Sequence, residues 1–536
     1  KGNSLFNQYI NGGYMSNIII DSVDYYYDSP YAEVFSCLSI EIDTSWKTGI
    51  VGRNGRGKTT LLKLISGELK AIKGDIHISD NVFYYPFKPD NINDITFNVI
   101  KNSIAPFSLW EEEMKRLIEK GDSKSLLKYG EIIERYEKHN GYNIDSMIEK
   151  EIVSVGLSHN ILYRNFNTLS GGEQTRALII SLFLRVDAFP LIDEPTNHLD
   201  MVGRKMLGEY LSSKRGFILV SHDRYFLDLC TDHIISINRN DIRINKGNFS
   251  KWKNNIDMEE EFERRKNENI KREIKSLKHA ADQKKRWSFR KEKEKKGSDD
   301  SGAIGHKSAK LMKRALNIER RMKRKIEDKK SLLMNKEKER KLKLDRIKSP
   351  DTILIINKIN INLEEKCILS DFSLSLEKGE RIAILGENGT GKTTLFNAIC
   401  GDIDISKGGI YCPNYVNYIR AYQIPKWKEG YLNDYLYSED VDITLFRNIM
   451  GVLGVCGEIF DRPLETFSMG ERKKVDLCRS FISPANFLLW DEPLNYIDLF
   501  SRKQIEDVIL KYKPTMIFIE HDKYFIENIA TRIINL

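Results

Sequence analysis

The chain has 536 residues, which is long enough for two domains with their own cores and for a further segment between them. Its formal net charge is +8 at pH 7. It contains no apolar run of the roughly 20 residues that a membrane span requires and no signal-peptide pattern, so we expect a cytoplasmic protein without a membrane partner. The seven cysteines are scattered and form no C-x-x-C pair, which argues against a disulfide framework and against a zinc site.

The same ordered set of short motifs occurs twice along the chain, in residues 20–225 and again in residues 355–525. The separation of 24 residues from Ser170 to Glu194 in the first copy is the same in the second copy. In both halves, strand-like runs alternate with helical stretches, which is typical of α/β layers with a largely parallel sheet. The sequence therefore predicts two domains of one fold in a single chain, and a monomer.

The repeat divides the chain into four parts. We expect an N-terminal extension over residues 1–14, a first α/β domain over residues 15–250, a linker over residues 251–350 and a second α/β domain over residues 351–536. The first copy carries 36 additional residues, which we place near residues 100–150 and expect to be helical.

Two glycine-rich segments satisfy G-x-x-x-x-G-K-[ST], and each follows a predicted strand and precedes a predicted helix. In this motif, backbone N–H groups surround phosphate oxygens, the lysine reaches the β- and γ-phosphates and the next hydroxyl binds Mg²⁺. We therefore expect two ATP sites. Their P-loop residues are Gly52, Asn54, Gly55, Gly57, Lys58, Thr59 and Thr60 in the first domain and Gly386, Asn388, Gly389, Gly391, Lys392, Thr393 and Thr394 in the second.

Two consecutive carboxylates follow an apolar, strand-like run in each half. These residues are Asp193, Glu194, Asp491 and Glu492. The aspartate of each pair is expected to hold Mg²⁺ through water, and the glutamate to polarise the water that attacks the γ-phosphate. His222 and His521 end a neighbouring strand in each half, where a side chain can reach the γ-phosphate. Because their spacing is matched, we interpret both histidines as functional rather than structural.

A further motif places the chain near a known superfamily. The segment Leu169-Ser170-Gly171-Gly172-Glu173 matches the signature of the ABC ATPases, and Phe467-Ser468-Met469-Gly470-Glu471 is a degraded copy of it. The chain resembles that superfamily over essentially everything from Ile18 to Leu536. The expected fold is therefore two P-loop ABC-type domains in tandem.

The resemblance also implies composite sites. In the superfamily, two domains pair head to tail, so that each signature completes the ATP site of the other domain. The completing residues are Ser468 and Gly470 for the Lys58 site, and Ser170 and Gly172 for the Lys392 site. In the superfamily, the strand-like run that ends in the two carboxylates is the Walker B segment, and an aspartate that follows it couples the two sites. Asp200 and Asp498 match this aspartate.

Three departures from the family pattern predict that the two sites are unequal. The adenine-stacking aromatic residue is matched by Tyr27 in the first half, but the corresponding stretch of the second half has no aromatic residue. The glutamine that senses the γ-phosphate is matched by Gln423 in the second half, whereas residues 84–87 of the first half contain no glutamine. Met469 replaces a glycine of the second signature.

Residues 251–350 hold 35 Lys and Arg against 18 Asp and Glu, a net charge of +17 that leaves the rest of the chain at −9. This concentration suggests a nucleic-acid partner, because phosphates are contacted largely by Lys and Arg. A solvated helical pair whose charges keep it soluble explains the charge equally well. The apolar spacing over residues 253–349 predicts two long antiparallel helices joined at a tip over residues 297–305.

The linker residues of interest form two groups. The basic residues that flank the tip are candidates for RNA contact, namely Lys284, Lys285, Arg286, Arg290, Lys307, Lys310, Lys313 and Arg314. The tip is small and weakly charged, and it comprises Ser298, Asp299, Asp300, Ser301, Gly302, Ala303 and Ile304 between two glycines.

Two ATPase domains, no membrane domain and a basic helical hairpin between them resemble the ABC-F family of ribosome-associated ATPases. Residues 281–288, 305–315 and 189–200 are similar to segments of its antibiotic-resistance branch, the Lsa and Vga types. The resemblance implies ATP and Mg²⁺ as cofactors, and the exit-site region of the bacterial ribosome, its large-subunit rRNA and the peptidyl-site tRNA as partners. It further implies that the tip dislodges lincosamides, pleuromutilins and streptogramin A compounds, and that ATP hydrolysis releases the protein.

Three other functions stay open at this point. A housekeeping ABC-F translation factor without a role in drug resistance is one, because tip sequences vary widely. A DNA-associated ATPase of the repair type would carry zinc-binding cysteines or a much longer coiled coil, and the sequence has neither. The ATPase subunit of a membrane transporter leaves the positive charge of the linker without a role.

Overall fold

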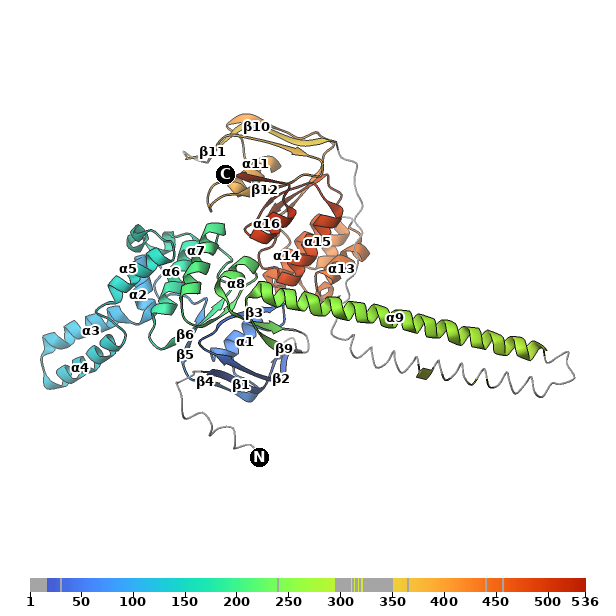
Figure 1. Cartoon of the computed structure of the whole chain (residues 1–536). Coiled ribbons are helices and arrows are strands. Elements are labelled where there is room, and N and C mark those ends of the chain that lie inside the picture. The colour runs from blue at the N-terminus through green and yellow to red at the C-terminus, as the bar shows by residue number, and fades with distance from the viewer. Residues whose placement is uncertain are drawn as a thin grey trace. The chain divides into compact units, whose positions relative to one another are not determined.

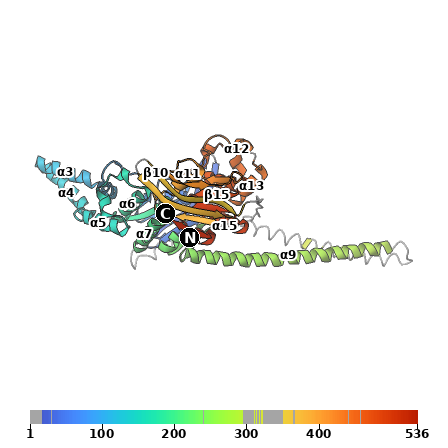
Figure 2. The ribbon, with the colours of Figure 1, turned by 90° about the horizontal axis from the view of Figure 1, so that it is seen from above.

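The computed structural model describes residues 17–28, 31–238, 241–294, 350–363, 366–438, 441–455 and 457–536, together with positions 310, 313, 317, 320 and 321. The chain divides into two compact units, one comprising Lys1–Phe249 and Arg340–Leu536 and the other comprising Ser250–Glu339. The first unit contains both α/β domains (Figure 1, Figure 2). The predicted extension over residues 1–14, the whole predicted tip, Lys307 and Arg314 lie outside the described residues.

The first domain is built on a six-stranded sheet of order β5-β6-β7-β3-β8-β9, in which every neighbouring pair except β8 and β9 is parallel. These strands are β3 (Lys47–Gly52), β5 (Asn81–Tyr85), β6 (Ala188–Asp193), β7 (Phe217–Val220), β8 (His233–Ile237) and β9 (Ile242–Lys246). An antiparallel sheet of order β2-β1-β4 accompanies it. Its strands are β1 (Asn17–Asp28), β2 (Tyr31–Asp43) and β4 (Lys73–Ile78).

The helices of the first domain include the predicted insertion. Those that follow the strands of the large sheet are α1 (Lys58–Ile65), α6 (Gly171–Leu184), α7 (Met201–Ser213) and α8 (Arg224–Cys230). Those of the insertion are α2 (Thr96–Ile104), α3 (Phe107–Lys120), α4 (Ser123–Lys138) and α5 (Ile144–Ser154). Helices α3 and α4 lie side by side in both views (Figure 1, Figure 2). Gly121, with φ of 64°, ends α3, and Asp122 begins α4 by accepting a hydrogen bond of 2.7 Å from the Ser125 N–H.

The second domain repeats this plan. Its five-stranded parallel sheet has the order β14-β15-β16-β12-β17, and its antiparallel sheet has the order β11-β10-β13. The strands are β10 (Thr352–Leu363), β11 (Lys366–Glu377), β12 (Arg381–Leu385), β13 (Lys407–Tyr411), β14 (Tyr418–Ala421), β15 (Phe487–Asp491), β16 (Met516–Ile519) and β17 (Arg532–Asn535). The helices are α11 (Lys392–Cys400), α12 (Leu432–Ser438), α13 (Ile443–Val452), α14 (Met469–Ile482), α15 (Leu499–Tyr512) and α16 (Lys523–Ile529). The predicted fold class is therefore confirmed.

Apolar residues bury the central strands of both sheets and so fix where the polar site residues lie. Strand β15 is buried along its whole length, and the Trp490 side chain is fully enclosed. Strand β7 is also buried throughout and β6 is buried from its second residue on, as expected for the central strands of a covered parallel sheet. The carboxylates that end β6 and β15 are thereby held at one edge of each sheet, where ligands bind in α/β folds.

The unit that contains the linker is described mainly through α9 (Phe249–Glu294), a helix of 46 residues. At 1.5 Å per residue such a helix is about 70 Å long. The first of the two predicted linker helices is therefore present. The side chains of Arg286, Lys310 and Lys313 are exposed, whereas only the backbone of Lys284, Lys285 and Arg290 is described.

Candidate ATP sites

Each P-loop joins the end of a central strand to the start of a helix, from β3 to α1 and from β12 to α11. Gly57 and Gly391 precede these helices with φ of 86° and 97°, in the left-handed region that favours glycine. At Gly57 an added Cβ would lie 2.4 Å from a methyl carbon of Val34, so no larger residue fits. This geometry leaves the backbone of both loops free to follow a chain of phosphates.

The two P-loop lysines are buried and face their own loops. Lys58 Nζ donates to the carbonyl oxygens of Gly52 and Arg53 at 2.9 and 3.1 Å. Lys392 Nζ makes the equivalent two bonds, both at 2.7 Å. Burial lowers the pKa of each lysine, and the nearby glutamates, Glu194 and Glu492, oppose that shift. A buried ammonium group of this kind is stabilised by an anionic ligand such as a triphosphate.

In the first site, the predicted Mg²⁺ ligands are in contact. The Thr59 hydroxyl donates to Asp193 Oδ2 at 2.7 Å, and the Tyr84 hydroxyl donates to the same oxygen at 3.0 Å. The other carboxylate oxygen, Asp193 Oδ1, is buried and has no hydrogen-bond partner among the described residues. A buried carboxylate oxygen without a donor fits a water-bound Mg²⁺ ion, which prefers oxygen ligands.

In the second site, the corresponding contacts are looser and include a cation. The Thr393 hydroxyl lies 3.4 Å from Asp491 Oδ1. The guanidinium of Arg420 donates to Asp491 Oδ2 at 3.3 Å. Both oxygens of this carboxylate therefore have a protein partner. The residues present still form an oxygen site for Mg²⁺, but one that a positive charge adjoins.

The glutamate of the first site, Glu194, has a histidine beside it. His222 Nε2 lies 3.3 Å from Glu194 Oε1. Burial, together with the charge of Asp193, raises the pKa of Glu194 to about 8. Burial and the positive charges of Lys58 and Arg502 hold the pKa of His222 well below its ordinary value. In this pair, burial therefore favours the neutral form of both the imidazole and the carboxyl group.

The glutamate of the second site is held as a carboxylate. Burial alone would raise the pKa of Glu492, but the contacts with His521 and Gln423 outweigh it and lower this pKa to about 2. Gln423 Nε2 donates to Glu492 Oε2 at 2.9 Å and Asn495 Nδ2 at 2.7 Å. His521 Nε2 lies 3.6 Å from Glu492 Oε1, longer than a hydrogen bond. Gln423 thus lies beside the glutamate of the second site.

The signature segments begin helices α6 and α14. Ser170 and Glu173 form a capping box at the start of α6, and Ser468 and Glu471 form one at the start of α14. Each serine accepts a hydrogen bond from the backbone N–H of its glutamate, at 3.3 and 3.2 Å. At Gly172 an added Cβ would lie 2.8 Å from the His198 carbonyl oxygen, so this position needs glycine. The two helix starts therefore present backbone N–H groups and a serine hydroxyl together.

Residues of the two domains meet at the P-loops. Asn54 Nδ2 of the first P-loop donates to the carbonyl oxygen of Tyr496 at 2.9 Å. At Gly470 of the second signature an added Cβ would lie 2.7 Å from Asn54 Nδ2. Asn388 of the second P-loop donates to His198 O and to Asp200 Oδ2, both at 3.3 Å. Each P-loop asparagine thus contacts the segment that follows the Walker B strand of the opposite domain.

The two coupling aspartates have different partners. Asp200 and Asp498 both begin the helix that follows, by accepting from a backbone N–H three residues on. The second oxygen of Asp200 accepts across the domains, from Asn388. The second oxygen of Asp498 accepts from Lys474 of its own domain at 2.9 Å, where both side chains are buried. The predicted coupling positions are therefore not equivalent.

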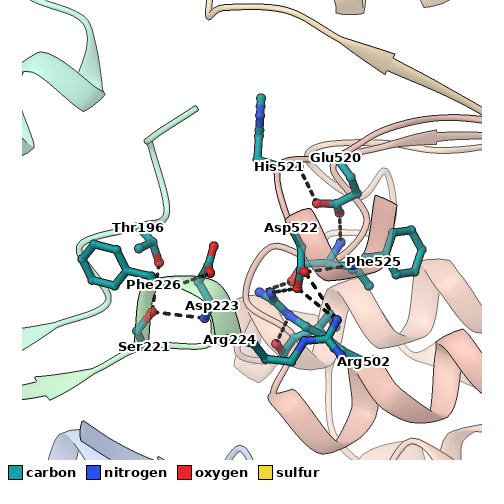
Figure 3. A network of polar contacts seen from close by, with 12 residues as sticks. Thr196, Ser221, Asp223, Arg224, Phe226, Arg502, Glu520, His521, Asp522 and Phe525 are labelled. Atoms are coloured by element: carbon teal, nitrogen blue, oxygen red, sulfur yellow. Dashed lines mark hydrogen bonds and ion pairs between the residues drawn. The ribbon is translucent and has the colours of Figure 1, made fainter. Parts of the chain in front are cut away.

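A cluster of buried charged residues joins the two domains next to His521 of the second site. Arg224 of α8 donates to Asp522 at 3.3 Å and forms an ion pair with Glu506 of α15. Arg502 donates to the same Asp522 at 2.9 Å, so two guanidinium groups converge on one carboxylate (Figure 3). Asp522 follows His521 directly in the chain. The histidine of the second site is therefore anchored next to the contact between domains.

Two site residues were missed by sequence reasoning, Tyr84 and Arg420. Tyr84 and Arg420 lie on the strand next to the Walker B strand, and only the pairing of strands far apart in the sequence brings them to the aspartates. Tyr27, the predicted adenine-stacking residue, is 41% exposed, and its hydroxyl lies 3.1 Å from Thr60 Oγ1. That position beside α1 leaves the Tyr27 ring accessible to a ligand.

The fold and these two sites define a tandem P-loop ATPase. The family profile described as ABC transporter matches residues 35–197 and 369–495, which together are more than half of the chain. The chain therefore belongs to the ABC transporter family, and its two ATP-binding domains make it an ATPase. Among the described residues, no helix combines the length and the apolar character needed to cross a bilayer.

Individual proteins resemble the chain over nearly its full length. The ATP-binding protein YdiF of Bacillus subtilis (strain 168) is 28% identical over 520 residues, which cover 94% of this chain and 77% of YdiF. The ribosome protection protein VmlR of the same organism is 26% identical over 519 residues, which cover 92% of this chain and 82% of VmlR. The fold of the chain is similar to that of the archaeal ribosome recycling factor aABCE1, as seen in a crystal structure of its complex with the archaeal ribosomal stalk protein aP1. The TM-score is 0.59 and the sequence identity is 18%, and the match covers 96% of this chain and 87% of aABCE1.

Proposed function

We propose that the protein is a ribosome-associated ATPase of the ABC-F type, in the antibiotic-resistance branch that includes the Lsa and Vga types. In its ATP-bound form it binds the exit-site region of the bacterial ribosome, beside the peptidyl-site tRNA. Its linker dislodges lincosamide, pleuromutilin or streptogramin A antibiotics from the peptidyl-transferase centre. ATP hydrolysis then releases the protein, which acts in the cytoplasm.

The observation that carries this proposal is the likeness to VmlR over 92% of the chain, which includes the segment between the ATPase domains. A likeness limited to the two ATPase domains would support ATP hydrolysis alone. The net charge of +17 over residues 251–350 supports a polyanionic partner, because Lys and Arg supply most contacts with nucleic-acid phosphates. The exposed side chains of Arg286, Lys310 and Lys313 are consistent with such contacts.

The site residues have the following roles in this proposal. Lys58 and Lys392 bind the phosphates, and Glu194 and Glu492 orient the attacking water. Thr59 with Asp193, and Thr393 with Asp491, hold Mg²⁺, which neutralises charge on the β- and γ-phosphates. The signature residues of one domain close on the γ-phosphate bound by the other. Closure with ATP then favours the ribosome-bound state because ATP contacts both domains only in that arrangement.

Growth in the presence of antibiotics tests the proposal directly. A drug-sensitive bacterium that expresses the chain should grow at higher lincosamide and pleuromutilin concentrations than one with an empty vector. The Glu194→Gln/Glu492→Gln double variant, expressed at the same level, should lose this protection because it cannot complete the ATPase cycle.

A linker variant with a matched control separates RNA contact from general charge. Replacing Arg286, Lys310 and Lys313 by Gln should reduce the protection. Replacing three exposed lysines of the ATPase domains by Gln, namely Lys70, Lys128 and Lys428, removes the same charge and should leave it intact. A well-expressed wild type that gives no protection, yet sediments with ribosomes, would favour the housekeeping translation factor instead.

A further inference from the structure

Tyr84 and Arg420 occupy the same position in the two ATPase domains. Strand β5 pairs in parallel with β6, and β14 pairs in the same way with β15. Tyr84 pairs with Leu191, and Arg420 pairs with Leu489. Each of these leucines lies two residues before the predicted Mg²⁺-binding aspartate of its domain. In each domain the side chain of Tyr84 or Arg420 reaches that aspartate. At this equivalent position, the first site therefore has the phenol of Tyr84 and the second site has the guanidinium of Arg420.

Arg420 is fixed in place by its surroundings. It is 6% exposed, and it donates to Asn397 Oδ1 on α11 at 2.7 Å and to Asp491 Oδ2 at 3.3 Å. Its guanidinium lies 4.7 Å from the ring centroid of Tyr422, and Asp402 lies 3.5 Å away. A buried guanidinium with these partners stays charged. Asp491 is therefore paired with a permanent positive charge.

Tyr84 supplies no such charge. Its side chain is a phenol, which donates a hydrogen bond but carries no positive charge. Its hydroxyl and that of Thr59 both donate to one oxygen of Asp193, and the other oxygen is left without a hydrogen-bond partner among the described residues. The aspartate of the first site therefore has no guanidinium on its carboxylate, and one of its oxygens is left for a metal ion.

We propose that Arg420 is a positioning residue that occupies the carboxylate of Asp491, so that the second site binds Mg²⁺ with lower affinity than the first when both hold ATP. The physical reason is that a guanidinium beside the carboxylate repels a divalent cation and competes for its oxygen. The difference expected between the two metal affinities is on the order of tenfold. The inference concerns the ATP sites alone and does not depend on a role at the ribosome.

The test measures metal binding rather than turnover. The full-length Glu194→Gln/Glu492→Gln chain is loaded with ATP, and free Mn²⁺ is followed by electron paramagnetic resonance during a titration, with Mn²⁺ in place of Mg²⁺. Two classes of bound Mn²⁺ are expected, one for each site. In the same chain, Arg420→Tyr should convert the weak class to a tight one, and Tyr84→Arg should convert the tight class to a weak one.

Two controls separate this role from a structural one. Arg420→Lys keeps the positive charge and should keep the weak class. Binding of a fluorescent ATP analogue in EDTA should be the same in all variants, because no metal is then present. A structural defect would weaken this metal-free binding as well.

A single class of Mn²⁺ affinity in the parent chain would overturn the proposal. So would an Arg420→Tyr chain that binds the analogue normally and keeps its weak class. If Arg420→Tyr does not fold, the Tyr84→Arg chain decides, and an unchanged tight class in that chain would overturn the proposal.

Discussion

Two glutamates with the same predicted role lie in opposite environments. Glu194 is buried beside Asp193 and a neutral His222, and its pKa is raised to about 8. Glu492 accepts hydrogen bonds from Gln423 and Asn495, and its pKa is lowered to about 2. A general base must be deprotonated to act. At the residue scale, the two sites are therefore expected to respond differently to pH.

A pH profile of each isolated site tests this difference. In the Glu492→Gln variant only the Glu194 site turns over, and kcat/KM should rise about tenfold between pH 7 and pH 9 as Glu194 loses its proton. The ratio kcat/KM is the quantity to measure because it reports the pKa values of the free enzyme.

The Glu194→Gln variant is the matched control. Its working base, Glu492, is already ionised above pH 4, so its kcat/KM should change little over the same range. Superimposable profiles for the two variants would contradict the assignment of different environments.

The P-loops and the carboxylate pairs could be predicted from the sequence because each is a contiguous motif. Its residues all lie at the end of one strand and in the loop that follows it. The sequence did not predict Tyr84 or Arg420, because these residues reach the aspartates only through strand pairs that join distant segments. The predicted inequality of the sites rested on Tyr27, Gln423 and Met469. The structure adds a further physical reason for it, the positive charge of Arg420 beside Asp491.

At the scale of elements, helices α8, α15 and α16 meet through buried charges. Arg224 of α8 contacts Glu506 of α15 and Asp522 at the start of α16, and both carboxylates are about 1% exposed. Burial alone would raise the pKa of Asp522, but the charges of Arg224 and Arg502 lower it. These helices come from both domains, so the cluster ties one domain to the other.

Arg224→Met should destabilise the protein by about 3 kcal/mol, because it removes the ion-pair partner of the buried Glu506 and one of the two guanidinium groups on Asp522. The free energy of unfolding in urea measures this loss. The folded-state pKa of Asp522 lies below its unfolded value near 3.9, so this stabilisation is present above that pH and disappears as the pH falls further.

Lys523→Met at the start of α16 is the control for this change. Lys523 is 45% exposed, and its ion pair with Glu527 spans 4.0 Å, so its loss should cost less than about 1 kcal/mol. Equal losses for Arg224→Met and Lys523→Met would show that the buried cluster is no stronger than a surface pair.

The elements themselves were largely predictable. The insertion near residues 100–150 was expected from the 36 additional residues of the first copy, and the end of α2 and helices α3, α4 and α5 lie in this region. The first linker helix was expected from a long stretch without helix breakers, and α9 follows it. The pairing of α3 with α4 could not be foreseen, because it depends on the short turn at Gly121 and Asp122.

At the scale of the whole molecule, each ATP site includes contacts from both domains. Asn54 contacts Tyr496, and Asn388 contacts His198 and Asp200. Each P-loop therefore contacts residues of the opposite domain, and under the proposed function ATP binding would close the two domains on these contacts. The proposed function uses this closure to control binding to the ribosome.

Sedimentation with bacterial ribosomes tests that claim most directly. The Glu194→Gln/Glu492→Gln chain, which binds ATP without completing hydrolysis, is centrifuged with ribosomes through a sucrose cushion in the presence of ATP, ADP or no nucleotide. We predict that the chain pellets with ribosomes in ATP and stays in the supernatant in ADP or without nucleotide. A well-folded chain that fails to pellet in ATP, or that pellets equally in all three conditions, would contradict ATP-dependent binding to the ribosome.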